Sequence, residues 1–171
     1  VINKFDFQFN VHIRYKTSVL FESMCRKSKI TNVLYGLAEG SPCSFKHAAA
    51  VVRGSKILST GVNNSNRTKW KKNITVCFHA EMDALRTFLA VFGDDYTKFN
   101  KLCMWAIRIP NESSDYGLLR KSNPCMECFM NLQKYGFGKI AFSNDNGDID
   151  IVKLSDYSTT YRSNAQKVHN K

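Results

Sequence analysis

Hydrophobic and polar residues alternate strictly near the start of the chain. Apolar residues occupy every second position from Phe5 to Tyr15, and a polar residue stands between each pair. A period of two is typical of a strand with one buried face. The pattern therefore predicts an N-terminal strand. We place it in an extension over residues 1–28, which also includes a helical piece over 18–27.

The rest of the chain alternates between strand and helix patterns. The predicted elements are a helix over 31–39, strands over 47–52 and 56–62, a polar loop over 63–73, a helix over 79–92, a strand over 102–109, a polar loop over 111–123, a helix over 125–135, and strands over 139–143 and 148–154. The turn signal at 144–147 makes the last two strands antiparallel. This order predicts one α/β domain, 1–171, with a mixed sheet, a core over 41–154 and a polar, basic tail over 155–171.

Length and composition narrow the class of protein. A chain of 171 residues suits one domain with a proper core, and no apolar run reaches the roughly 18 residues of a membrane span. The lack of a long apolar run leads us to expect no membrane partner. The six cysteines show no pattern typical of a disulfide framework, so we expect a reduced, intracellular setting. The cysteines outside the motif described below, Cys25, Cys43, Cys77 and Cys103, are expected to be small buried apolar residues.

The charge balance indicates an anionic partner. Lysine and arginine number 25 against 14 acidic residues, which gives a net charge of +11. Charge of this size suits a nucleic acid or a nucleotide phosphate, although a basic solvated surface would look the same in the sequence.

Two short fragments carry the candidate chemistry. His79-Ala80-Glu81 opens one predicted helix, and Pro124-Cys125-Met126-Glu127-Cys128 opens the next. Cys125 and Cys128 lie at i and i+3, so their sulfurs share one side of a helix start, where thiol pKa values are lowered. With His79 they provide three zinc ligands and leave a fourth position open, which is typical of a catalytic site.

Glu81 lies two residues from His79, close to the metal ligands without being one of them. A carboxylate in this position is suited to take a proton from water and pass it to a leaving amine. His-x-Glu followed by Pro-Cys-x-x-Cys is also the known pattern of zinc nucleobase deaminases. The two fragments together therefore predict hydrolytic deamination with Zn²⁺ as cofactor.

On these residues the chain resembles the cytidine deaminase-like superfamily over about 41–154. The resemblance implies a three-layer α/β/α sandwich around a five-stranded mixed sheet, with His79, Cys125 and Cys128 as zinc ligands and Glu81 as the proton shuttle. It also implies substrate contacts, at Asn63 for a sugar hydroxyl, at Ala80, and at Asn123 through its carbonyl, where the family usually has Ser or Thr. Phe45 and His47 are candidates for the pocket border, and ordinary packing at a strand start explains them equally well.

The substrate remains open among three hypotheses. Glu127 stands where the adenine-acting tRNA branch has methionine, and the final hairpin resembles the branch that acts on free nucleosides. Both features favour cytosine in a free nucleoside or nucleotide. The loop residues Arg67, Lys69, Trp70, Lys71 and Lys72 combine charge with an aromatic ring and favour RNA or single-stranded DNA. The third hypothesis is a catalytically idle subunit of a nucleoprotein or viral assembly. The N-terminal strand is also a candidate for pairing in a homo-oligomer.

Overall fold

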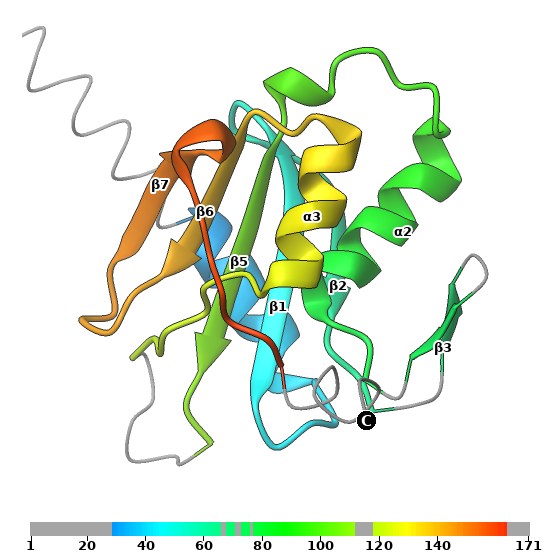
Figure 1. Ribbon diagram of the computed structural model, residues 1–171. Helices are drawn as coiled ribbons and strands as arrows, with labels where there is room; N and C mark the ends of the chain where they lie inside the picture. The colour runs from blue at the N-terminus through cyan, green and yellow to red at the C-terminus, as the bar shows by residue number, and fades with distance from the viewer. Residues whose placement is uncertain (1–28, 66–67, 71–72, 76, 112–117, 164–171) are drawn as a thin grey trace, which may run out of the picture.

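The computed structural model describes residues 29–65, 68–70, 73–75, 77–111 and 118–163 (Figure 1). The predicted N-terminal strand and the helical piece over 18–27 lie outside the described residues. The first described element is a helix that includes residues 29–39, in agreement with the apolar periodicity there.

A five-stranded mixed sheet forms the centre of the molecule. Its strands are β1 (Lys46–Arg53), β2 (Lys56–Val62), β5 (Cys103–Ile109), β6 (Lys139–Ser143) and β7 (Ile149–Lys153), in the spatial order β2-β1-β5-β6-β7. β5 and β6 are parallel, and every other neighbouring pair is antiparallel. The five-stranded mixed sheet and its antiparallel final pair are therefore confirmed. The turn between β6 and β7 depends on Gly147, whose φ of 84° suits glycine.

Helices cover both faces of this sheet. The helix over 29–39 packs on one face, and α2 (Ala80–Phe92) and α3 (Met126–Tyr135) pack on the other (Figure 1). Alternate residues of β1 explain the two layers, because Ala49 and Val51 belong to the core under α2 and α3, whereas Ala48 and Ala50 belong to the opposite core. The predicted three-layer α/β/α sandwich is confirmed.

Close contact between α2 and β2 fixes where α2 begins. Gly61 lies so near the backbone of Ala84 that a side chain there would collide with it. The Ser59 hydroxyl donates to the Ala84 carbonyl at 2.8 Å, and the Val62 N–H donates to Asp83 Oδ2 at 3.1 Å. These contacts hold the first turn of α2, and with it the His79 and Glu81 region, against the sheet.

The loop expected over 63–73 is instead partly a hairpin. β3 (Thr68–Trp70) pairs with β4 (Asn73–Thr75) in a separate two-stranded sheet, and Asn64 forms an isolated bridge with Phe78 at its base. Threonine, tryptophan and isoleucine favour extended backbone, which explains why this polar stretch pairs with itself. Among the described residues, no helix has the length and apolar content to cross a membrane.

The described part of the tail packs onto the domain. After a short 3-10 helix, η3 (Leu154–Asp156), residues 157–163 run across the start of α3 (red in Figure 1). The Tyr157 hydroxyl donates to the Pro124 carbonyl at 2.9 Å, and the Met126 N–H donates to the Tyr161 carbonyl at 2.8 Å. The segment expected to be a polar tail is therefore, up to residue 163, part of the wall beside the motif cysteines.

Candidate metal centre and active site

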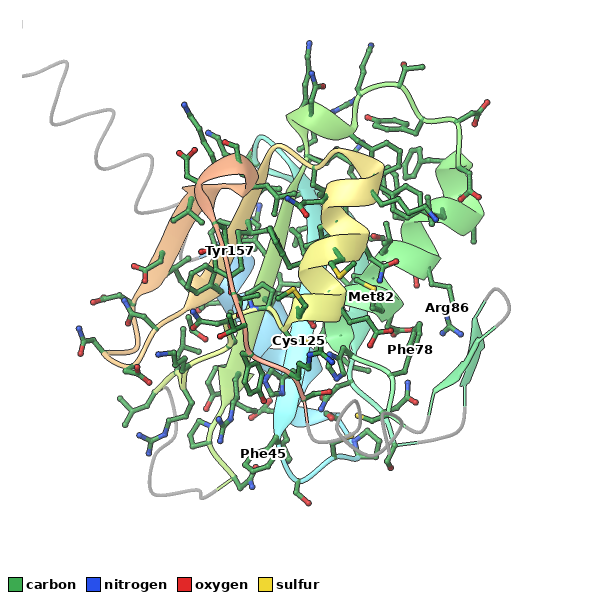
Figure 2. All side chains as sticks on the ribbon, in the orientation of Figure 1. Phe45, Phe78, Met82, Arg86, Cys125 and Tyr157 are labelled. Carbon is green, nitrogen blue, oxygen red and sulfur yellow. The ribbon has the colours of Figure 1, made fainter. Side chains whose placement is uncertain are left out.

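Two helix N-termini bring the motif residues together at one end of the sheet. His79 is the N-cap of α2, Cys125 is the N-cap of α3, and Cys128 lies in the first turn of α3. Cys125 is labelled at the start of α3 in Figure 2. The N-terminal dipole of a helix favours negative charge, so both helices support thiolates at this point.

The three ligand atoms have the spacing that zinc requires. His79 Nδ1 lies 3.3 Å from Cys128 Sγ and 3.4 Å from Cys125 Sγ, and all three atoms lie within 4.8 Å of one another. Tetrahedral zinc with ordinary Zn–N and Zn–S bonds separates a nitrogen and a sulfur ligand by about 3.5 Å. The donor set of one imidazole and two thiols fits Zn²⁺, and ring nitrogen Nδ1 is the atom that would bind it.

Hydrogen bonds and charges within the cluster shift the pKa values of all three candidate ligands. The hydrogen bond from the Cys128 thiol and the contact with His79 lower the pKa of Cys125 to about 4, against the opposing effect of burial. Burial alone would lower the pKa of His79, but the hydrogen bond to Cys125 and the charge of Glu81 raise it to about 9. The pKa of Cys128 is raised, because it shares a proton with Cys125 and is buried. A cation replaces these shared protons.

Glu81 is buried beside the ligands. Its exposed fraction is 6%, and burial raises the pKa of its carboxyl group. A carboxylate with a raised pKa both accepts and releases a proton readily near neutral pH. The structure therefore brings the expected proton shuttle to the metal ligands, at the start of α2.

A cavity of about 410 Å³ opens in front of the cluster. Its lining comes from the segment before β1, the ends of β1 and β2, the starts of α2 and α3, and the tail. The lining residues are Cys43, Ser44, Phe45, His47, Asn63, Cys77, His79, Ala80, Glu81, Ser122, Asn123, Cys125, Tyr161 and Ser163. This volume is in the range of small-molecule sites. All five substrate contacts expected from the sequence, which are Phe45, His47, Asn63, Ala80 and Asn123, lie on its wall.

Hydrogen bonds of the Asn63 side chain fix the conformation of the backbone on one side of the cavity. Its Oδ1 accepts from the Ser41 hydroxyl at 2.7 Å and from the His47 N–H at 2.8 Å, while its Nδ2 donates to the Phe45 carbonyl at 2.6 Å. An amide nitrogen has two hydrogens, so a second Nδ2–H remains for a ligand. Asn63 is thus a positioning residue for the 41–47 segment, and its expected sugar contact depends on this remaining hydrogen.

The geometry determines which nitrogen of His47 faces a ligand. Burial lowers the pKa of His47 to about 4, so the ring is neutral at pH 7. Its Nδ1 lies 3.1 Å from the Phe45 carbonyl, which only accepts, so Nδ1 carries the proton. Nε2 is then a hydrogen-bond acceptor on a ring that lines the cavity, which suits a sugar hydroxyl.

Ala80 and Asn123 both line the cavity. Ala80 is the first residue of α2, where an N–H has no acceptor within the helix. Asn123 precedes Pro124 and lies on the cavity wall, and its buried Oδ1 has no hydrogen-bond partner. Both positions agree with the substrate contacts that the family resemblance implies at these two residues, and the roles of the two residues stay predictions.

The expected phosphate or nucleic-acid contacts are only partly visible. Arg67, Lys71 and Lys72 lie outside the described residues, and Lys69 and Trp70 belong to β3, of which only the backbone is described. Their role remains a prediction.

Two lining features were missed or misjudged from the sequence. Cys43 and Cys77 are partly exposed on the cavity wall, so the expectation of small buried residues is wrong for them, and Cys103 is partly exposed as well. Tyr161 and Ser163 also line the cavity, and no pattern in the sequence marks them as lining residues.

Comparison with known proteins agrees with this geometry. The sequence model of the family described as "Cytidine and deoxycytidylate deaminase zinc-binding region" matches residues 24–144, which is most of the chain. The chain belongs to this family of zinc-binding deaminases. No curated protein sequence matches the chain closely enough to count as a relative.

Cytidine and dCMP deaminases are among the solved structures that are similar to this chain. A cytidine deaminase from Burkholderia pseudomallei superimposes with a TM-score of 0.51 at 20% identity, over 73% of this chain and 90% of that one. A cytidine deaminase mutant from Mycobacterium tuberculosis gives a TM-score of 0.46 at 19% identity, over 73% and 91% of the two chains. A dCMP deaminase from the cyanophage S-TIM5 gives 0.43 at 20% identity, over 68% and 84%. At these identities the first match supports the deaminase fold and nothing finer.

Proposed function

We propose that the protein hydrolyses the amine of cytosine in a free nucleoside or nucleotide, with water as co-substrate and the uracil form and ammonia as products. The observation that carries this proposal is the cavity whose wall joins His79, Cys125 and the buried Glu81 to the sugar-contact candidates Asn63 and His47. Its volume suits a ligand of nucleoside or nucleotide size.

The chain's own residues have separate tasks in this reaction. When bound by His79, Cys125 and Cys128, zinc supplies Lewis acidity that makes water nucleophilic at neutral pH. Glu81 takes the two protons of the attacking water in turn, and passes one to the ring nitrogen of the base and the other to the leaving amine, which departs as ammonia. The carbonyl of Asn123 and the N–H of Ala80 orient the base.

Two features favour cytosine in a small substrate. Glu127 replaces the methionine of the adenine-acting branch, and the antiparallel pairing of β6 with β7 is like that of the free-nucleoside branch. The tail closes one side of the cavity, since Tyr161 and Ser163 are part of its lining.

Cytosine in RNA or single-stranded DNA is the second candidate. The net charge of +11 favours it, and so do the exposed rings of Phe45 and Tyr161 on the cavity wall, which are 57% and 58% exposed. Exposed rings are suited to stack on neighbouring bases.

The deciding experiment compares substrates on one preparation. The zinc-loaded protein is incubated with cytidine, deoxycytidine, their monophosphates and a single-stranded oligonucleotide, and ammonia and the uracil product are measured. We expect turnover of at least one small substrate. Turnover of the oligonucleotide alone supports the second candidate. No turnover of any cytosine with zinc fully loaded contradicts deamination and favours a catalytically idle subunit.

A further inference from the structure

His47, Arg108 and Arg120 form a row across three neighbouring backbone segments beside the cavity. His47 in β1 pairs with Arg108 in β5, and Arg108 forms an antiparallel bridge with Arg120. Directly opposed residues in antiparallel pairs have their side chains on the same face. Arg108, Ala106 and Met104 are every second residue of β5, so their side chains lie on the same face of the sheet. Met104 and Ala106 belong to the core under α2 and α3. The row therefore lies on the face of the sheet that carries the metal cluster.

Among the residues that the structure describes, no acidic side chain forms an ion pair with Arg108. Its guanidinium carbon lies 4.5 Å from the centre of the Phe45 ring, and its Nε is buried without a hydrogen-bond partner. In the described part of the chain, the ion pairs are those of Arg86 and Lys121, and none involves Arg108. A partly buried cation without a counter-charge is unfavourable, unless a ligand supplies the negative charge.

Arg108 is also close to the place where a substrate binds. It contacts Phe45 and stands opposite His47, and both of these residues line the cavity. His47 shares the cavity wall with the metal ligand His79. The guanidinium and the metal centre therefore approach the same lining residue. Phe45 is labelled at the end of the sheet below Cys125 in Figure 2.

We propose that Arg108, held against the face of Phe45, binds a phosphate group of the substrate and makes the site prefer cytosine nucleotides to nucleosides. This inference rests on the proposed deamination of cytosine and names the substrate class within it. A guanidinium presents parallel N–H donors that match two phosphate oxygens, and the aromatic face fixes its plane. The phosphate is either the monoester of a free nucleotide or a backbone diester of a single strand, because both offer the same oxygens.

Direct binding tests this inference without relying on turnover. In the zinc-loaded Glu81→Gln protein, calorimetry compares deoxycytidine, deoxycytidine monophosphate, inorganic phosphate and a single-stranded oligonucleotide. We expect the monophosphate to bind more tightly than the nucleoside. Adding Arg108→Gln is expected to reduce that preference by about 10-fold to 100-fold, with the nucleoside affinity unchanged.

Two further variants control for misfolding and for a general loss of positive charge. Arg108→Lys retains the charge without the planar donor pair, so we expect an intermediate preference even if Arg108→Gln folds poorly. Arg53→Gln is the matched control, because Arg53 lies at the other end of β1 and bonds to the Tyr96 hydroxyl at 3.1 Å. It is expected to leave the phosphate preference intact.

The outcomes separate the two proposals. Equal affinity for nucleoside and monophosphate, or an equal loss of both in Arg108→Gln, overturns the role of Arg108 even if the protein deaminates cytosine. An Arg108-dependent preference for phosphate in a protein that turns over no cytosine supports the anion site and contradicts the proposed reaction. Tighter Arg108-dependent binding of the oligonucleotide than of the monophosphate assigns the phosphate to a strand.

Discussion

The backbone N–H of Met126 donates to the carbonyl of Tyr161 at 2.8 Å, so the C-terminal segment is tied to the first turn of the helix that carries both zinc-binding cysteines. The N–H groups at the start of a helix have no acceptor within the helix, and here a residue 35 positions further along the chain supplies one. The tail is consequently a part of the active-site wall, and a change in it is expected to affect substrate binding.

Tyr157→Phe tests how firmly this segment is attached. The change removes the hydrogen bond to the Pro124 carbonyl but keeps the ring contacts with Phe129 and Phe142. We expect a loss of about 1 kcal/mol in the free energy of unfolding and a higher KM, measured by urea denaturation and steady-state kinetics. Tyr96→Phe removes a hydroxyl that bonds to Arg53, away from the cavity, and is expected to leave KM unchanged. Equal KM values in the two variants would contradict a role for the tail in binding.

Zinc binding is expected to require His79, Cys125 and Cys128. Cys128→Ser removes a buried thiol from a cluster whose ligand atoms lie within 4.8 Å of one another, so we expect the bound zinc to fall from one ion per chain to near none. Atomic absorption measures the content. Cys103→Ser changes a cysteine of β5 outside the cluster and is expected to keep its zinc.

Zinc is also expected to stabilise the fold. At about a thousand times its dissociation constant, a ligand that binds only the folded state raises the free energy of unfolding by about 4 kcal/mol. Thermal denaturation with and without a chelator measures this shift for the wild type. A similar shift in Cys128→Ser would show that the metal binds elsewhere.

Glu81→Gln is expected to separate metal binding from catalysis. The amide has nearly the same shape as the buried carboxyl group but transfers no proton, so kcat should fall by about 100-fold to 10,000-fold while zinc and fold are retained. Because the raised pKa shows that burial disfavours the charged carboxylate, we expect no loss of stability. Glu127→Gln changes an exposed carboxylate on α3 and is expected to remain active. Comparable losses of activity in both variants would argue against a proton shuttle at Glu81.

The protonation of His47 is expected to make the free energy of unfolding depend on pH. Its pKa is about 4 in the folded protein and 6.5 as an ordinary histidine, so between these values the unfolded chain binds more protons than the folded one. The free energy of unfolding contributed by His47 is therefore complete above about pH 6.5 and falls as the pH is lowered toward 4, by at most about 3 kcal/mol.

The measurement compares the wild type with His47→Gln at about pH 7.5 and pH 5 by urea denaturation. Glutamine has no titrating proton, so the wild type should lose more stability than the variant on acidification. The difference between the two proteins cancels the titration of other groups, including the metal ligands. A difference that is the same at both pH values would show that His47 has the same pKa in the folded and the unfolded protein.

The sequence alone was sufficient for the five strands of the main sheet, for α2 and α3, and for the residues of the metal centre. The apolar periods predict β1, β2, α2, β5, α3, β6 and β7 close to their observed bounds, because each period reflects which face of a local segment is buried. His79, Glu81, Cys125 and Cys128 are equally local, since each lies at a helix start that its own neighbours define. The sequence also pointed to Asn63 and His47 through the family resemblance.

Only the tertiary structure decided what surrounds that centre. The tail wall, the partly exposed Cys43 and Cys77, and the row of His47, Arg108 and Arg120 all depend on segments that are distant in sequence. No period marks residues 157–163, because their position depends on hydrogen bonds to Pro124 and Met126 and not on a buried face of their own. In the sequence, Arg108 is a single charged residue within an apolar strand. In the structure, the pairing of β1 with β5 places Arg108 opposite His47, and its guanidinium contacts the Phe45 ring. The metal-binding residues are thus encoded locally, whereas the walls of the cavity beside them depend on long-range pairing.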